Sequence, residues 1–158
     1  MCTCSFDTKD SAWTSHGNWY LPFSGQGHFD GELDAWVGLH RNGGYICACP
    51  VISPSFHTTA PCFYPDCKMA KDEEMFADTE NRDMRPNIAY MGASATKFCL
   101  VERVAGANKN VPRDACVIRL NVFGLKYSYK GELQIADHHR STRSFLASGH
   151  HYRFALWV

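Results

Sequence analysis

The sequence predicts an all-β domain, built as an antiparallel β-sandwich or a small β-barrel with one short peripheral helix. Three observations lead to this class. Apolar and polar residues alternate with a period of two in short runs, Gly, Asn and Pro clusters separate these runs, and helical spacing is confined to one short segment. The evenly spaced strands are typical of sandwiches and barrels. At 158 residues the chain has the size of one domain, so we expect a single β-rich domain over residues 1–158.

The strongest local signal is a β-hairpin in the first half of the chain. Ala35, Val37 and Leu39 alternate with Asp34, Trp36 and Gly38, which is a strand pattern. A second apolar run covers residues 45–51, and Asn42-Gly43 lies between the two runs. Asn-Gly between extended runs favours a tight hairpin turn, because both residues accept a positive φ. We therefore predict two antiparallel strands joined at this turn.

The second half of the chain returns to strand patterns after a proline-rich stretch. Four prolines between residues 50 and 65 exclude a helix interior or a central strand, so this stretch is predicted to be a surface loop. Residues 66–78 carry apolar side chains at helical spacing and are the predicted helix. Further strands are expected at residues 97–101, 117–123, 125–129, 132–136 and 151–158, with a turn at Gly124. Residues 125–129 and 132–136 are predicted to form a second hairpin around Lys130-Gly131.

Composition excludes two classes of partner. No apolar run reaches the roughly 18 residues that a membrane helix needs, so no membrane span is expected. Sixteen basic and sixteen acidic residues balance, which makes nucleic acid an unlikely ligand. The charge is nevertheless uneven, because residues 1–60 carry two basic and five acidic side chains while residues 109–158 carry eight and three. This gradient is consistent with head-to-tail self-association into a homo-oligomer.

The eight cysteines are consistent with disulfide crosslinks or with buried thiols. They are Cys2, Cys4, Cys47, Cys49, Cys62, Cys67, Cys99 and Cys116. No C-x-x-C spacing occurs, which disfavours a zinc ribbon or a thioredoxin-like site. Cys47 and Cys49 share one face of a predicted strand and stand too far apart to bridge each other, so each needs another partner, and Cys2 and Cys4 offer a matching pair. Disulfides would favour an extracellular location.

Residues 26–38 suggest a second hypothesis, a metal site. His28, Glu32 and Gly38 partly resemble the first of the two signatures of the cupin barrels, and Gly106, Pro112 and Asn121 partly resemble the second. That resemblance implies a divalent metal ion held by His28 and Glu32, as a cofactor of a cupin-like enzyme. This chain departs from the pattern at two ligand positions, with Gln26 and Val117 where the signatures carry histidine. A third imidazole would have to come from His138-His139 or His150-His151.

Aromatic side chains are the main candidates for ligand binding. Trp13, Trp19, Tyr20 and Trp36 fall within the first quarter of the chain, interleaved with turn residues. Trp and Tyr rings stack on apolar faces and add one polar group, which suits carbohydrate binding at the rim of a β domain. The alternative is that these rings belong to the core.

No catalytic motif competes strongly with a binding role. The chain has no G-x-S-x-G sequence and no local cysteine-histidine-acid grouping. We therefore expect a non-enzymatic, lectin-like binding domain for a glycan, another cell-surface ligand or a small molecule, with no cofactor. The alternatives are the cupin-like metal-dependent enzyme and a structural, self-assembling protein.

Overall fold

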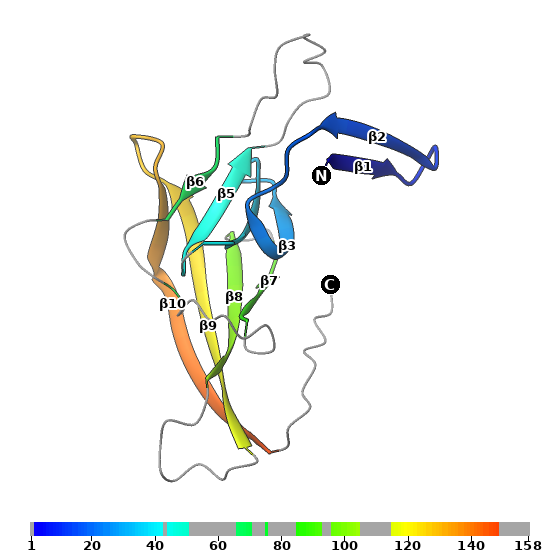
Figure 1. The fold of residues 1–158 in the computed structure, drawn as a ribbon. Coiled ribbons are helices and arrows are strands. Elements are labelled where there is room, and N and C mark those ends of the chain that lie inside the picture. The colour runs from blue at the N-terminus through cyan, green and yellow to red at the C-terminus, as the bar shows by residue number, and fades with distance from the viewer. Residues whose placement is uncertain are drawn as a thin grey trace.

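The protein is built entirely from strands in the part of the chain that the structure describes. The computed structural model describes residues 2–42, 44–50, 66–70, 75, 85–92, 96–104 and 115–148 (Figure 1). Its strands are β1 (Thr3–Asp7), β2 (Ala12–Gly17), β3 (Phe23–Asp30), β4 (Ala35–His40), β5 (Ile46–Pro50), β6 (Lys68–Met69), β7 (Asn87–Tyr90), β8 (Lys97–Val104), β9 (Ala115–Tyr127) and β10 (Leu133–Ser148). The predicted strand at residues 151–158 and the predicted loop at residues 51–65 lie outside the described residues.

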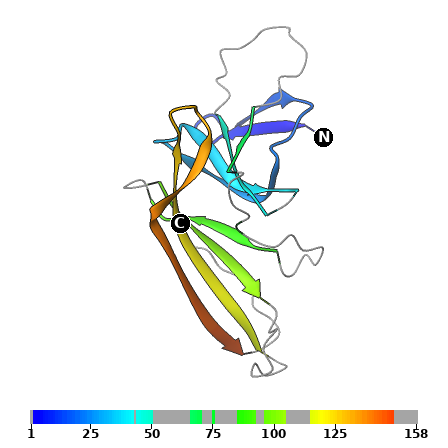
Figure 2. The ribbon, with the colours of Figure 1, turned by 90° about the vertical axis from the view of Figure 1, so that its left-hand side faces the viewer.

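The strands form three antiparallel sheets. The sheet orders are β1-β2, β3-β4-β5-β6 and β10-β9-β8-β7. The β3–β6 sheet lies against the upper part of the β7–β10 sheet, and the lower ends of β8, β9 and β10 extend beyond it (Figures 1 and 2). The β1–β2 hairpin lies to one side in Figure 1. The predicted antiparallel all-β class is confirmed, in the form of a sandwich with no closed barrel among the described strands.

The two predicted hairpins are present, but one predicted turn is wrong. β4 and β5 pair with Leu39 opposite Ile46, as the Asn-Gly signal predicted. β9 and β10 also pair, with Leu133 opposite Tyr127. Gly124 makes no turn, because it lies inside β9 and pairs with a residue of β8 on one side and of β10 on the other. Pairing with strands on both sides keeps the glycine extended.

The predicted helix at residues 66–78 is wrong at its first turn. Lys68 and Met69 form β6, the edge strand that pairs with Ala48 and Cys47 of β5. The helical spacing of apolar residues is a local signal, and here tertiary pairing with a fully buried strand overrides it. Residues 71–74 and 76–78 lie outside the described residues.

The core lies between the two four-stranded sheets and follows the period of two. In β4, Ala35, Val37 and Leu39 are buried, whereas Trp36 points to the other face and stays partly exposed. Phe98 of β8 and Phe123 of β9 are fully buried and stack with ring centroids 6.0 Å apart. The cluster consists of Leu33, Ala35, Val37, Leu39, Ile46, Ala48, Ala70, Met75, Ile88, Phe98, Leu100, Phe123, Leu125 and Leu133.

Beyond the core, the same face of the long sheet carries a polar network. Asn121 Nδ2 donates a hydrogen bond of 2.9 Å to Glu102 Oε2, and Thr142 Oγ1 donates one of 2.8 Å to Asn121 Oδ1. Arg119 Nη1 lies 3.9 Å from the same Glu102 oxygen. Burial raises the pKa of Glu102, and Arg119 and Asn121 partly offset this. The network thus pairs polar groups of the three adjacent strands β8, β9 and β10.

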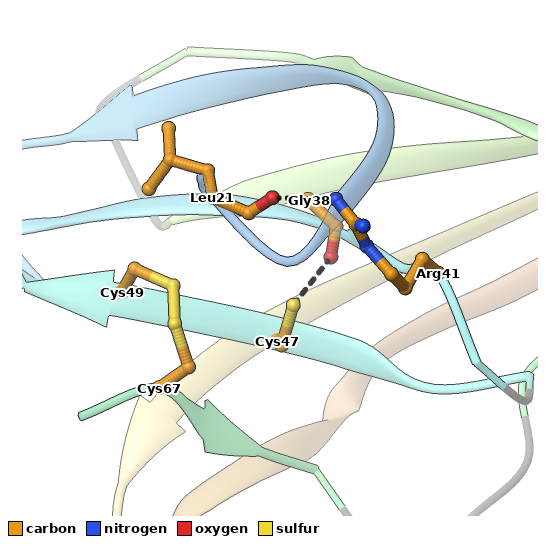
Figure 3. The surroundings of a disulfide bond; sticks show 6 residues. All are labelled: Leu21, Gly38, Arg41, Cys47, Cys49 and Cys67. Carbon is orange, nitrogen blue, oxygen red and sulfur yellow. Dashed lines mark hydrogen bonds between the residues drawn. A yellow bond between two sulfur atoms is a disulfide. The ribbon is translucent and has the colours of Figure 1, made fainter. Parts of the chain in front are cut away.

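The cysteines are only partly crosslinked. Cys49 of β5 forms a disulfide with Cys67, directly opposite it in the register that continues from β6 (Figure 3). Their Cα atoms are 4.4 Å apart, a separation typical of a non-hydrogen-bonded antiparallel pair. Cys2, Cys4, Cys47, Cys99 and Cys116 are free thiols, and Cys62 lies outside the described residues. The expected pairing of Cys2 and Cys4 with Cys47 and Cys49 is therefore wrong, because β1 belongs to a different sheet from β5.

We expect the disulfide to contribute about 3 kcal/mol to stability, because it closes a loop with a sequence separation of 18 residues. The double variant Cys49→Ser/Cys67→Ser should lose roughly this free energy of unfolding, measured by urea denaturation. Reductant should lower the stability of the parent chain to a similar extent and leave the double variant unchanged. A parent chain insensitive to reductant would contradict this assignment.

Candidate functional site

An exposed aromatic pair lies on the outer face of the β3–β6 sheet, the face turned away from the core. Phe29 of β3 stands opposite Trp36 of β4, with ring centroids 5.8 Å apart. Their exposed fractions are 43% and 39%. The neighbouring residues Asp30, Ala35 and Val37 are buried on the other side, so strand alternation directs these two rings outward. We call the surface formed by Phe23, Phe29 and Trp36 the aromatic face.

Two glycines make room for the third ring of the aromatic face. Gly27 and Gly38 are opposite each other in β3 and β4. A Cβ atom at Gly38 would stand 2.6 Å from the Phe23 ring, and one at Gly27 would stand 2.7 Å from it. The Phe23 ring therefore lies directly on the backbone of both strands. Any larger residue at these two positions would lift the ring from the sheet.

The disulfide continues the row of outward-facing side chains. Cys49 is the cross-strand neighbour of Trp36. Phe29, Trp36 and Cys49 therefore follow one another across β3, β4 and β5, and the row ends at Cys67, the residue before β6. Cys47 lies on the same face one row away, fully buried, with its thiol 3.6 Å from the carbonyl oxygen of Gly38 (Figure 3). Burial raises the pKa of the Cys47 thiol to about 12. At this side of the site, the disulfide fixes the segment of Cys67 covalently to β5.

The segment before β3 adds a polar and aromatic group. Arg41 Nη2 donates a hydrogen bond of 3.0 Å to the carbonyl oxygen of Leu21 (Figure 3). The Arg41 backbone N–H donates one of 2.9 Å to the carbonyl oxygen of Pro22. The guanidinium carbon lies 4.0 Å from the centroid of the Tyr20 ring, which is a cation-π geometry. Tyr20 remains half exposed. Arg41 therefore fixes this segment to the end of β4.

The four aromatic residues named from the sequence lie in different settings. Trp36 is on the aromatic face, and Tyr20 is held by Arg41. Trp19 is 5% exposed, and its indole N–H donates to the carbonyl oxygen of His16. Trp13 is 73% exposed on the β1–β2 hairpin, paired with Phe6 at 5.0 Å. The structure does not gather all four at one surface, and the sequence reasoning missed Phe29 and Phe23.

The two residues of the predicted metal site are directed to different partners. His28 Nε2 is 3.0 Å from the carbonyl oxygen of Ile88 in β7, and Glu32 Oε2 accepts a hydrogen bond of 2.9 Å from Thr96 Oγ1. Both contacts connect the β3–β6 sheet to the β7–β10 sheet. Among the described residues, no group of three or more His, Cys, Asp or Glu side chains is arranged to hold a metal ion.

Asp30, which the sequence reasoning did not single out, fixes the turn beside the aromatic pair. The residue is fully buried, and its Oδ1 accepts hydrogen bonds from the backbone N–H groups of Glu32 (3.0 Å) and Leu33 (2.9 Å). Burial of the Tyr90 side chain is the main cause that raises the pKa of Tyr90, and the nearby Asp30 carboxylate raises it further. An Asp whose oxygen accepts N–H groups two and three residues later is a common turn former. In the sequence, the Asp30-Gly31 pair was the signal that could have predicted this turn.

The chain belongs to a protein family whose description is "Protein of unknown function (DUF1668)", which matches residues 1–143. No curated protein and no solved structure matches the chain. No helix in the described part of the chain is long and apolar enough to cross a membrane. The matched residues include the whole of the aromatic face.

The packing of Phe23 predicts a strong effect of a single methyl group. Gly38→Ala should lower the free energy of unfolding by about 1–3 kcal/mol, because the new Cβ overlaps the Phe23 ring. Gly31→Ala is the matched control, since a Cβ there meets no atom within 4 Å, and it should change stability by less than about 1 kcal/mol. Equal stabilities of the two variants in thermal or urea unfolding would refute the packing.

The raised pKa of Cys47 predicts that its thiol resists alkylation. At pH 8.5 the folded protein should keep Cys47 protonated and unmodified by iodoacetamide, because the thiol ionises only near pH 12 and is buried. Exposed Cys2 and Cys4 serve as internal controls and should be alkylated under the same conditions. In denaturant Cys47 should react as well, and peptide mass spectrometry would measure all three thiols. Rapid labelling of Cys47 in the folded state would contradict its burial.

Proposed function

We propose that this protein is a non-enzymatic binding domain that takes a carbohydrate on its aromatic face. The observation that carries the proposal is the pair of Phe29 and Trp36, two partly exposed rings fixed side by side on a sheet. Exposed large aromatic pairs are costly on a protein surface unless a partner covers them. A binding role explains why both strands present an aromatic residue at the same register position.

A sugar suits the chemistry around this pair. One side of a pyranose ring presents C–H groups that stack on an aromatic ring, and its edge presents hydroxyl groups that need polar partners. The turn from Gly31 to Asp34 follows Phe29 and precedes Trp36, and its Asp34 is exposed, whereas the Glu32 carboxylate is held by Thr96. Carboxylates accept hydrogen bonds from sugar hydroxyls. Stacking and hydroxyl recognition can therefore act on the same ligand.

The rigidity of the surface supports binding with little loss of conformational entropy. The Asp30 carboxylate holds the adjacent turn, and the Phe23 ring lies on the glycines of β3 and β4. The disulfide fixes Cys49, the cross-strand neighbour of Trp36. Because these groups are ordered before a ligand arrives, association pays less for ordering side chains.

The cupin-like enzyme remains a weaker candidate function. Its two named ligands, His28 and Glu32, already have partners in the opposite sheet. A metal bound by both would have to displace contacts that join the two sheets. The aromatic face requires no such rearrangement, which is why we favour binding over metal-dependent catalysis.

The proposal predicts that Trp36→Ala weakens glycan binding strongly. A glycan array followed by calorimetry on the strongest hit should give a loss of at least about 10-fold in affinity for this variant, since stacking on one ring contributes about 1.4 kcal/mol or more. Trp13→Ala removes an exposed tryptophan from the hairpin and is the matched control, which should bind like the parent chain. Both variants should keep the parent circular dichroism spectrum.

Two outcomes would reject carbohydrate as the ligand. The first is an array on which the correctly folded parent chain binds no glycan. The second is a glycan whose affinity is reduced by Trp13→Ala and left unchanged by Trp36→Ala, which would place the binding surface on the hairpin.

A further inference from the structure

Two free thiols lie side by side at the beginning of the chain. Cys2 Sγ and Cys4 Sγ are 3.5 Å apart, and both residues are exposed. Between them, the Thr3 hydroxyl donates a hydrogen bond of 2.5 Å to the carbonyl oxygen of Trp19, which is itself buried. Because successive side chains of a strand alternate, this anchor turns Thr3 to one side and the two cysteines to the other. The two thiols therefore converge on solvent.

The distance between the sulfur atoms indicates which chemistry they suit. Two sulfurs bound to one tetrahedral Zn²⁺ at about 2.3 Å stand about 3.8 Å apart, whereas a disulfide requires about 2.05 Å. The observed 3.5 Å is thus close to the separation in a zinc complex and far from a bond. Thiolates also select soft cations among the common biological metals. The pair is already arranged as a two-sulfur chelate for such an ion.

One chain supplies only half of a tetrahedral zinc site. Structural zinc is almost always bound by four protein ligands. No third His, Cys, Asp or Glu among the described residues joins Cys2 and Cys4 in a metal-binding group. A second copy of the chain would supply the missing two sulfurs and complete a four-cysteine set.

The face of the hairpin that carries the thiols also carries apolar surface that a second copy would cover. Phe6 lies two residues after Cys4 and so shares its face, and Trp13 is the cross-strand neighbour of Phe6. The two rings are in contact at 5.0 Å, yet their exposed fractions are 47% and 73%. A two-stranded hairpin is only marginally stable alone, so covering this face would also stabilise it.

We propose that Cys2 and Cys4 bind Zn²⁺ together with the same two cysteines of a second copy, with one ion bridging two chains. Four thiols release four protons to solvent and form four Zn–S bonds, so no oxidant or reductant is required. The Phe6 and Trp13 rings of the two hairpins are covered beside the metal. This site lies on the β1–β2 hairpin and is separate from the aromatic face.

The test uses the full chain, purified with its exposed thiols reduced and its Cys49–Cys67 disulfide intact, stripped of metal and then titrated with ZnCl2. Elemental analysis should find one zinc per two chains, and sedimentation should show dimers with zinc and monomers after addition of a chelator. Dimer formation should shift the tryptophan emission to shorter wavelength as Trp13 is buried, and Trp13→Phe should remove most of that shift.

Variants separate this site from the other thiols. Cys2→Ser and Cys4→Ser should each weaken zinc binding at least 10-fold and abolish the zinc-dependent dimer. Cys99→Ser removes a different free, partly exposed thiol and should behave like the parent chain. One zinc bound per monomer, zinc binding that survives the loss of both Cys2 and Cys4, or no zinc binding with a disulfide formed between these two residues would each overturn the proposal.

Discussion

The packing of β4 and β5 against β8 and β9 is the constraint on which the rest of the structure depends. Val37, Leu39 and Ile46 meet a layer that contains the stacked rings of Phe98 and Phe123, and all of these side chains are almost completely removed from water. Burial of this apolar surface is the main favourable term in folding. Because successive side chains of a strand point to opposite faces, burying one side of β4 and β5 in the core places every other side chain on the outer face. Trp36, Gly38, Cys47 and Cys49 are outward-facing for this reason.

The same constraint explains why the cysteines have three different fates. Cys47 and Cys49 share the outer face of β5, but only Cys49 stands opposite another cysteine, because the short strand β6 brings Cys67 into register with it. Cys47 stands opposite Met69 and stays a buried thiol. Cys2 and Cys4 lie on a hairpin that forms its own sheet, so their thiols remain exposed and close to each other. Sheet membership and register decide which thiols are crosslinked, buried or available.

Polar side chains join the two sheets at the edge where β3 meets β7. His28 contacts the backbone of β7, while Asp30 and Glu32 both accept hydrogen bonds from Thr96. Hydrogen bonds offset the cost of burying a carboxylate, and Asp30 Oδ1 has such partners, whereas no described residue bonds its buried Oδ2. These contacts position the turn that separates Phe29 from Trp36. The residues that looked like metal ligands in the sequence thus support the proposed binding surface from below.

The sequence by itself determined the class of the fold, the β4–β5 hairpin and the alternation of Trp36 with Ala35 and Val37, because strand period and Asn-Gly turn chemistry act between residues close in the chain. It could not determine the partner of Cys49, the pairing of Phe29 with Trp36, or the strand at Lys68–Met69, since each depends on register between segments distant in sequence. Helical spacing in residues 66–78 and the glycine at position 124 were misleading for the same reason. Only the tertiary structure decided these points, because backbone pairing with neighbouring strands outweighs a weak local preference.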